Sequence, residues 1–215
     1  MVQTGASTVS STPQSETKPK DDEIDLFGIT DVGKVRKENQ DHFLVATVHQ
    51  QLVIHNTSFE DPSTLPVRGQ RFASIMLVAD GVGGTAGGGE ASHLTVQTIA
   101  RYVTTTMRCF QPSGGPPPEE QLLESLRAAA REAHAAVRAQ ASGRGESKMA
   151  TTLTLAINVW PRTYFMQIGD SRGYFYADGK MRRVTRDQTL AQDLVDQGVL
   201  PADRAAKSPF SHVLA

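Results

Sequence analysis

The sequence predicts an α+β domain in which two antiparallel β-sheets pack on each other with helices outside, a four-layer αββα sandwich. Short apolar runs of strand length come first, two long helical segments follow, and strands then return. This order does not alternate strand and helix as a doubly wound parallel sheet does. The chain has 215 residues, of which 39% are hydrophobic. That length suits one globular domain with a buried core.

The expected strands are apolar runs bounded by turn residues. The first group is 24–30 (IDLFGIT), 41–48 (DHFLVATV), 51–55 (QLVIH) and 71–79 (RFASIMLVA), and the second is 151–160, 162–169 and 173–177. Their lengths and β-branched content are typical of strands. Asp178-Gly179 predicts a tight turn into a further strand at 180–185. The polar, proline-bearing stretch 56–70 predicts a surface loop.

Three segments have the period of an amphipathic helix. The first begins at Glu90 and ends before the proline-rich stretch 111–118, and the second spans 119–141. A third, at 189–197, stops at Gly198. The residues expected to face the core in the first two are Ala91, Leu94, Thr95, Ile99, Tyr102, Val103 and Met107, then Leu122, Leu126, Ala129, Ala133 and Val137.

Composition sets the expectations for domain limits and partners. Residues 1–22 are polar and predict a disordered N-terminal tail, which leaves 23–215 as the folded domain. The net charge of −1 gives no basic field, so we expect neither nucleic acid nor a membrane as partner. A single cysteine, Cys109, and the lack of a secretory signal favour a cytoplasmic location.

The glycine-rich stretch 78–92 (VADGVGGTAGGGEAS) is the sharpest functional signal. An apolar strand delivers Asp80 into six glycines within nine residues, before a helix begins. Aspartate oxygens suit Mg²⁺ or Mn²⁺, and glycines allow close backbone approach. Two other interpretations compete: a flexible solvated connection, and a dinucleotide loop, since Gly81, Gly83 and Ala86 fit G-x-G-x-x-A. The adjacent Asp80 and the lack of a later acidic strand end count against a dinucleotide.

Two further stretches place polar side chains between strands. Residues 36–41 (RKENQD) are by themselves more typical of a plain polar hairpin loop, although they contain Arg36, whose guanidinium suits an anionic oxygen group. Residues 169–174 (GDSRGY) contain Asp170, and alone they are typical of an ordinary tight turn.

Taken together, these stretches resemble the metal-dependent protein serine/threonine phosphatases of the PPM family, type 2C. The matching segments occur in the family's order: ITDVGKVRKENQD, VADGVGGTAGGGEAS, MATTLTLA, QIGDSRGYFY and VTRDQT. The resemblance runs from about Asp25 to Asp196 and implies a β-sandwich flanked by helices. It also implies hydrolysis of phosphoserine and phosphothreonine on proteins, with two Mg²⁺ or Mn²⁺ ions that activate a water.

The resemblance assigns roles to six residues. Asp80 would bridge both ions, the Gly81 carbonyl would bind one, and Asp170 corresponds to a position that helps to bind a third. Arg36 would hold the substrate phosphate. Gln40 and Asp41 would surround waters bound to the metals. The implied partners are phosphorylated proteins and the serine/threonine kinase that acts opposite the enzyme.

The sequence also departs from the family pattern. Gln40 stands where many relatives have glutamate, and Val82 stands where some have a proton-donating histidine. Nothing after Asp187 resembles the family's two remaining metal carboxylates or its last strands. We therefore expect weak metal binding and little hydrolysis from these 215 residues. A non-catalytic phosphoprotein-binding module and, more weakly, a dinucleotide-binding protein remain alternatives.

Overall fold

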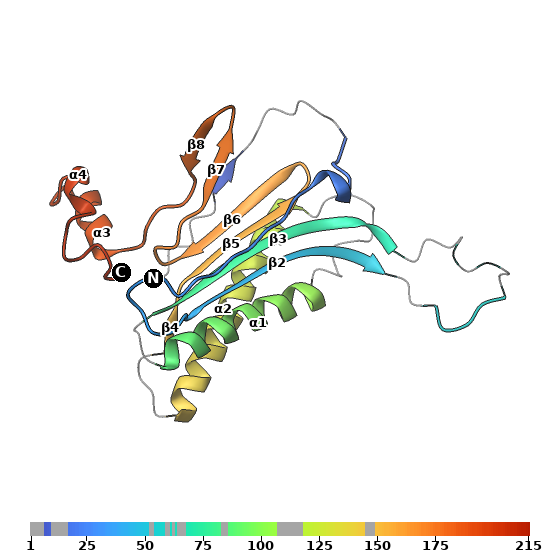
Figure 1. Cartoon of the computed structure of the whole chain (residues 1–215), viewed down its shortest axis with the longest axis horizontal. Coiled ribbons are helices and arrows are strands. Elements are labelled where there is room, and N and C mark those ends of the chain that lie inside the picture. The colour runs from blue at the N-terminus through green and yellow to red at the C-terminus, as the bar shows by residue number, and fades with distance from the viewer. Residues whose placement is uncertain are drawn as a thin grey trace.

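The computed structural model describes residues 7–9, 17–51, 54–58, 61, 63, 68–82, 86–106, 118–144 and 149–215. They form one six-stranded antiparallel sheet, two long helices on one face of it, and a separate two-stranded ribbon (Figure 1). The α+β class and the antiparallel pairing are confirmed. Of the four layers expected, the described residues supply one layer of helices and one large sheet, and the ribbon is the remaining strand pair.

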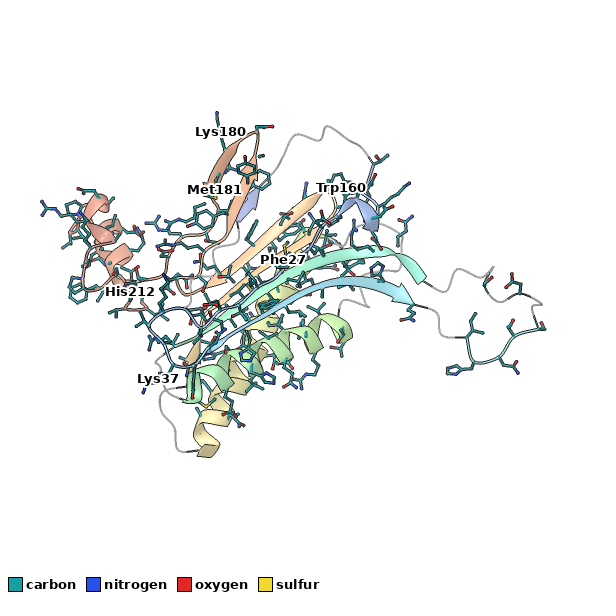
Figure 2. All side chains as sticks on the ribbon, viewed as in Figure 1. Phe27, Lys37, Trp160, Lys180, Met181 and His212 are labelled. Atoms are coloured by element: carbon teal, nitrogen blue, oxygen red, sulfur yellow. The ribbon has the colours of Figure 1, made fainter. Side chains whose placement is uncertain are left out.

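The large sheet has the strand order β1-β6-β5-β3-β2, with β4 paired to β3. Its bounds are β1 Ser7–Val9, β2 Asp41–Gln51, β3 Arg68–Val82, β4 Ala150–Thr151, β5 Leu153–Val159 and β6 Arg162–Ile168. The ribbon is β7 Tyr174–Ala177 and β8 Lys180–Arg183, joined at Asp178 and Gly179, which both have positive φ. The hairpin expected from Asp178-Gly179 is confirmed, and Lys180 marks its tip in Figure 2.

Two long helices cover one face of this sheet. Helix α1 spans Ala86–Thr106 and α2 spans Glu119–Arg144. Helix α1 begins four residues before the expected Glu90, because glycines 87–89 form its first turn instead of a loop. The expected stripe of α2 is buried throughout. On α1 the expected positions 91, 95, 99 and 103 are buried, and Met107 lies outside the described residues.

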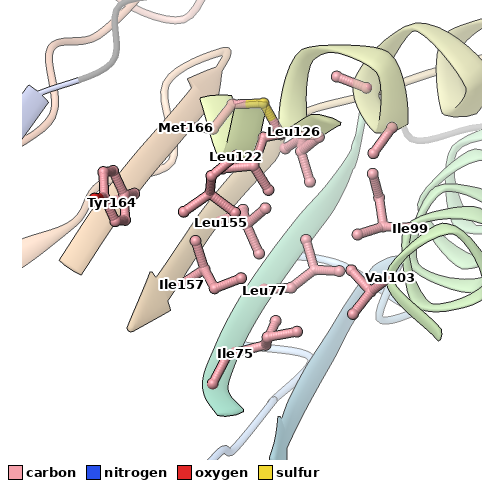
Figure 3. Close-up of a cluster of buried hydrophobic side chains, with 14 of the residues drawn as sticks. Ile75, Leu77, Ile99, Val103, Leu122, Leu126, Leu155, Ile157, Tyr164 and Met166 are labelled. Atoms are coloured by element: carbon pink, nitrogen blue, oxygen red, sulfur yellow. The ribbon is translucent and has the colours of Figure 1, made fainter. Parts of the chain in front are cut away.

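The core lies between the sheet and the helices (Figure 3). Strand alternation turns Ile75, Leu77 and Ala79 of β3 toward the helices, and each is at most 2% exposed. Leu77 lies opposite Leu44 on β2 and Leu155 on β5. The helices add Ile99, Val103, Leu122 and Leu126 to the same cluster. This packing fixes the register of β3 and therefore the direction of every side chain along it.

The other face of the sheet carries the alternate residues. Met76 and Val78 of β3 and Phe43 of β2 are 37–44% exposed there. The segment 24–30, expected to be a strand, has no strand pairing and passes over this face, with Gly28 against the Phe43 ring. The expectation was wrong because apolar content alone does not supply a neighbouring strand with free hydrogen-bonding groups. Phe27 is 83% exposed in this segment (Figure 2).

Part of the expected disordered tail makes contacts in the structure. Strand β1 pairs with β6, and the side chain of Arg71, 4% exposed, donates to Asp21 Oδ1 (2.7 Å) and Pro19 O (2.8 Å). Lys18 donates to the Arg71 carbonyl. A buried guanidinium needs such acceptors, so Arg71 holds the segment that contains Pro19 and Asp21 in place, although that segment is polar. Residues 1–6 and 10–16 lie outside the described residues.

The C-terminal part holds two short helices, α3 Leu190–Asp196 and α4 Ala202–Ala205, and a 3₁₀ turn, η1 Asp21–Glu23, lies near the N-terminus. Thr189 caps α3 by accepting from Gln192 N, and Gly198 has φ 72° beyond its end, as expected. Of the expected strand 51–55, Gln51 is the last residue of β2, 54–55 are not in a strand, and 52–53 lie outside the described residues. Within the described ranges, no helix has the length and apolar character to cross a bilayer.

Leu77→Ala should lower the free energy of unfolding by about 2–5 kcal/mol, because it leaves a cavity in the core. Met76→Ala, one residue away on the exposed face, should cost less than about 1.5 kcal/mol. Chemical denaturation measures both. Equal losses would contradict the assignment of the two faces.

Candidate functional site

Asp80 and Asp41 form a directly opposed pair across β2 and β3. Asp80 is four residues beyond Met76 on β3, so alternation places its side chain on the sheet face away from the helices. Asp41 is the first residue of β2 and shares that face. Side chains opposed across antiparallel strands lie about 4.5–5.5 Å apart at Cβ. The register therefore brings two carboxylates together at the end of the sheet.

The surroundings of the Asp80 carboxyl make it difficult to ionise. Partial burial is the largest cause, and the charge and hydrogen bond of Asp41 come next; with the charge of Asp170 they raise the pKa of Asp80 to about 6. Arg36 acts in the opposite direction. A nearby cation would stabilise the ionised form of a carboxyl group that its surroundings otherwise destabilise. Asp170 is therefore close enough to affect Asp80, as the sequence analysis requires.

A cavity of about 610 Å³ opens at this end of the sheet. Its lining brings together five of the six residues to which the sequence assigns roles. The charge of the sixth, Asp170, raises the pKa of Asp80. The five are Arg36, Gln40, Asp41, Asp80 and Gly81. Asp31, Val32, Val35, Lys37, Glu38 and Asn39 line the rest. The loop before β2 and the end of β3 thus form one concave surface with both acidic and basic groups.

The backbone of Asp80 is held by a segment far along the chain, which a second distant segment contacts in turn. Asp80 N donates to Thr152 Oγ1 (3.0 Å), and Asp80 O accepts from Thr152 N (2.9 Å) and Thr151 Oγ1 (2.8 Å). Thr152 Oγ1 is also 2.9 Å from Ser171 Oγ. The MATTLTLA and GDSRGY segments therefore meet at this strand end. Sequence reasoning missed these hydroxyls, although the matched Thr-Thr and Asp-Ser-Arg motifs contained them.

Glycine is required where α1 approaches the site. A Cβ on Gly81 would lie 2.5 Å from the Gly88 carbonyl, and one on Gly88 would lie 2.7 Å from Gln40 Oε1 and 3.1 Å from the Gly81 carbon. The glycines therefore serve as a close contact between β3, the first turn of α1 and the loop before β2. Residues 83–85 lie outside the described part.

Two residues that sequence reasoning did not single out lie behind the site. Ser92 Oγ on α1 donates to Gln40 O (2.5 Å), and His42 Nδ1 is 2.9 Å from Ser92 Oγ. Burial, and then the charge of His93, lower the pKa of His42, so its ring is neutral at pH 7. Ser92 ends the matched Gly-Glu-x-Ser segment, which was the available signal.

The later motifs support the turn that carries Asp170. The Gln188 side chain accepts from Gly169 N (2.9 Å) and donates to Gln167 O (3.2 Å). Gln188 therefore holds this turn. Arg172 makes a paired contact with Asp187 (2.6 and 3.0 Å), which raises the pKa of the guanidinium further above its usual range. This pair connects the turn to the segment after β8.

The donor set fits a weakly held divalent cation. Asp80 and Asp41 provide two opposed carboxylates, and hard oxygens are the ligands that Mg²⁺ and Mn²⁺ take. Among the described residues, however, no three Asp, Glu, His or Cys side chains gather closely enough for one ion. The dinucleotide alternative does not fit, because β3 is antiparallel to both of its long neighbours and Gly88 is covered by Gln40.

Comparison with known proteins defines the class. The family model described as "Protein phosphatase 2C" matches residues 53–193. "Serine/threonine protein phosphatase PstP" of Mycobacterium tuberculosis is 35% identical over 138 residues, which are 64% of this chain and 25% of that protein. "Serine/threonine phosphatase stp" of Listeria monocytogenes is 26% identical over 186 residues, 86% and 63% of the two chains.

Solved structures agree. The Mycobacterium tuberculosis phosphatase PstP/Ppp superposes with a TM-score of 0.56 at 28% identity, over 81% of this chain and 66% of that one. The S. agalactiae serine/threonine phosphatase has a TM-score of 0.63 at 21% identity, over 87% and 65%, and shows the fold alone. The chain belongs to the protein phosphatase 2C family, the PPM family that its motifs resemble. It spans a quarter to two thirds of the length of these relatives.

In the metal-free protein, Asp41→Asn should lower the pKa of Asp80 from about 6 toward 3.8, because it removes the opposed charge while burial remains. Carboxyl ¹³C NMR titration measures the pKa. Asp178→Asn, in the hairpin turn, is the control and should leave it unchanged. An unmoved Asp80 pKa in Asp41→Asn would contradict the proximity of the pair.

The same shift predicts how stability depends on pH. Because the pKa of Asp80 is raised in the folded state, the protonated side chain favours folding. This contribution to the free energy of unfolding is complete below about pH 3.8 and is lost as the pH rises through 6. Asp80→Asn should therefore raise the Tm of the metal-free protein at pH 7 by about 2–4 °C, a difference that disappears near pH 4. Thermal unfolding at the two pH values tests this sign.

Gly89→Ala should stabilise the protein by up to about 1 kcal/mol through helix propensity, since its new Cβ would meet Gln40 Cγ at an ordinary 3.6 Å. Gly88→Ala should instead cost about 1–3 kcal/mol, because its Cβ would lie 3.1 Å from the Gly81 backbone. Denaturation of the two variants gives the comparison. Stabilisation in both variants would mean that the first turn of α1 is not in close contact with the Gly81 backbone.

Proposed function

We propose that this chain carries the Asp80 side of a Mg²⁺- or Mn²⁺-dependent phosphatase centre that hydrolyses phosphoserine and phosphothreonine on proteins. The observation that carries the proposal is the opposed Asp41–Asp80 pair in the cavity that Arg36 also lines. Membership of the protein phosphatase 2C family supports it. So do the names of the relatives, which are serine/threonine phosphatases. One relative's structure is described as a complex with two manganese ions.

Each residue has a distinct task in this proposal. Arg36 binds and orients the phosphate, since a guanidinium makes paired hydrogen bonds to phosphate oxygens. Asp80, the Gly81 carbonyl and Asp170 would hold cations, and Asp41 and Gln40 would orient water beside them. When bound, the cations supply a more acidic water and neutralise the phosphoryl oxygens. Val82 has no ionisable proton to donate, so protonation of the leaving group needs another group.

The second candidate is a phosphoprotein-binding module without full catalytic power. It is favoured by the lack, among the described residues, of three close metal-ligating side chains. Arg36 would then bind the phosphate without hydrolysis. For either function we propose phosphorylated proteins as partners, an opposing serine/threonine kinase and a signalling role. The single cysteine supports a cytoplasmic location.

Asp80→Asn should reduce Mn²⁺-dependent hydrolysis of an aryl phosphate at least about 100-fold, because it removes a charged metal ligand. Arg36→Lys should mainly raise KM, since a point charge replaces a two-pronged donor. Steady-state kinetics with and without a chelator measure both effects. Asp178→Asn, which makes the same change in an exposed hairpin turn, is the matched control.

Chelator-resistant turnover, or full activity in Asp80→Asn, would contradict the enzyme proposal. Binding of a phosphopeptide that Arg36→Lys weakens, with no turnover in the wild type at any Mn²⁺ concentration, would establish the binding module instead.

A further inference from the structure

Ser92 connects the helix layer to the loop that carries Asp41. It lies on α1 and is fully buried. Its Oγ is 2.5 Å from the carbonyl oxygen of Gln40, 3.0 Å from that of Gly89, and 2.9 Å from His42 Nδ1. Gly89 belongs to the same helix, whereas Gln40 and His42 are the two neighbours of Asp41. One hydroxyl therefore contacts the chain on both sides of that aspartate.

The hydrogen-bond donors at this hydroxyl can be assigned. A serine hydroxyl has one proton and accepts through two lone pairs. Both carbonyl oxygens are acceptors, and the shorter distance directs the proton to Gln40 O. His42 Nδ1 then carries the proton that it donates to Ser92 Oγ. The helix thereby holds Asp41 through the peptide before it and the ring after it.

The Gln40 carbonyl is shared with the strand that carries Asp80. It accepts from Gly81 N (3.2 Å) as well as from Ser92 Oγ (2.5 Å). The acceptor precedes Asp41, and the Gly81 donor follows Asp80. This single oxygen therefore connects α1, the loop before β2 and the end of β3 within one residue of each carboxylate.

Two further hydrogen bonds lie within the segment that leads to Asp41. Asn39 Nδ2 donates to Thr30 Oγ1 (2.7 Å), and Asn39 Oδ1 accepts from Asp41 N (3.0 Å). Val35 is 92% exposed, so packing does not anchor the loop there. Helix α1, in contrast, is fixed by Ile99 in the core, which is 0% exposed. Ser92 thus belongs to a helix fixed in the core, and its hydrogen bonds hold the two neighbours of Asp41 against that helix.

We propose that Ser92 is a positioning residue of the metal site, whose hydroxyl fixes the Gln40–Asp41 peptide against Gly81 so that both carboxylates face the same cation. The metal part of this proposal rests on the proposed function. The positional part does not, because it concerns hydrogen bonds of the metal-free protein.

The test compares Ser92→Ala with Ser74→Ala in the full chain. Ser74, on β3, is also buried, at 3% exposure, and its Oγ is the buried side-chain atom for which the described residues provide no hydrogen-bond partner. Both variants lose the same buried atom, but only Ser92→Ala loses bonds to the site. Two quantities are measured at matched stability: hydrogen exchange of the Gly81 amide without metal, and the Kd for Mn²⁺ by titration calorimetry.

Ser92→Ala should accelerate exchange of the Gly81 amide by about 10-fold or more and weaken Mn²⁺ binding about 10-fold, while Ser74→Ala changes neither. Unchanged exchange of the Gly81 amide in Ser92→Ala would overturn the proposal. So would unchanged Mn²⁺ affinity where the wild type binds. If the wild type binds no Mn²⁺, the proposed function fails, and the Gly81 amide still decides the positioning role.

Discussion

The opposition of Asp41 and Asp80 across β2 and β3 is the constraint on which the site depends. It follows from register: Leu77 must face the helices, and every second residue, Asp80 included, then faces the other way. A slip of one residue would bury the carboxylate among apolar side chains. The hydrophobic core therefore positions the site, although no core side chain belongs to it.

Partial burial, and then the like charge of the opposed Asp41, destabilise the ionised form of Asp80, and its raised pKa expresses that cost. The protein maintains the arrangement with backbone hydrogen bonds from Thr151 and Thr152 and with close packing at Gly81 and Gly88. These contacts come from three separate sequence segments. Hydrogen bonding and packing thus offset the unfavourable environment of the Asp80 carboxylate. A divalent cation would stabilise that carboxylate directly.

The segments that matched the family in the sequence have unequal roles in the structure. The glycine-rich stretch and the loop before β2 supply the cavity lining. The Thr-Thr segment holds the backbone of Asp80, and Ser171 of the Asp-Ser-Arg segment contacts Thr152 in turn. Gln188 and Asp187 then hold the turn that carries Asp170. The motifs form one hydrogen-bonded unit in which only a minority of residues face the cavity.

The sequence by itself determined the class of fold, the two long helices and their buried stripes, the 178–179 hairpin and the identity of the candidate site residues, because these follow from local periodicity, turn chemistry and matched motifs. Only the tertiary structure decided that 24–30 is not a strand, that 87–89 are helical, and that Arg71 holds Asp21. It alone revealed Ser92 and His42 behind the site. Each of these depends on a partner distant in sequence, and no local pattern encodes that distance.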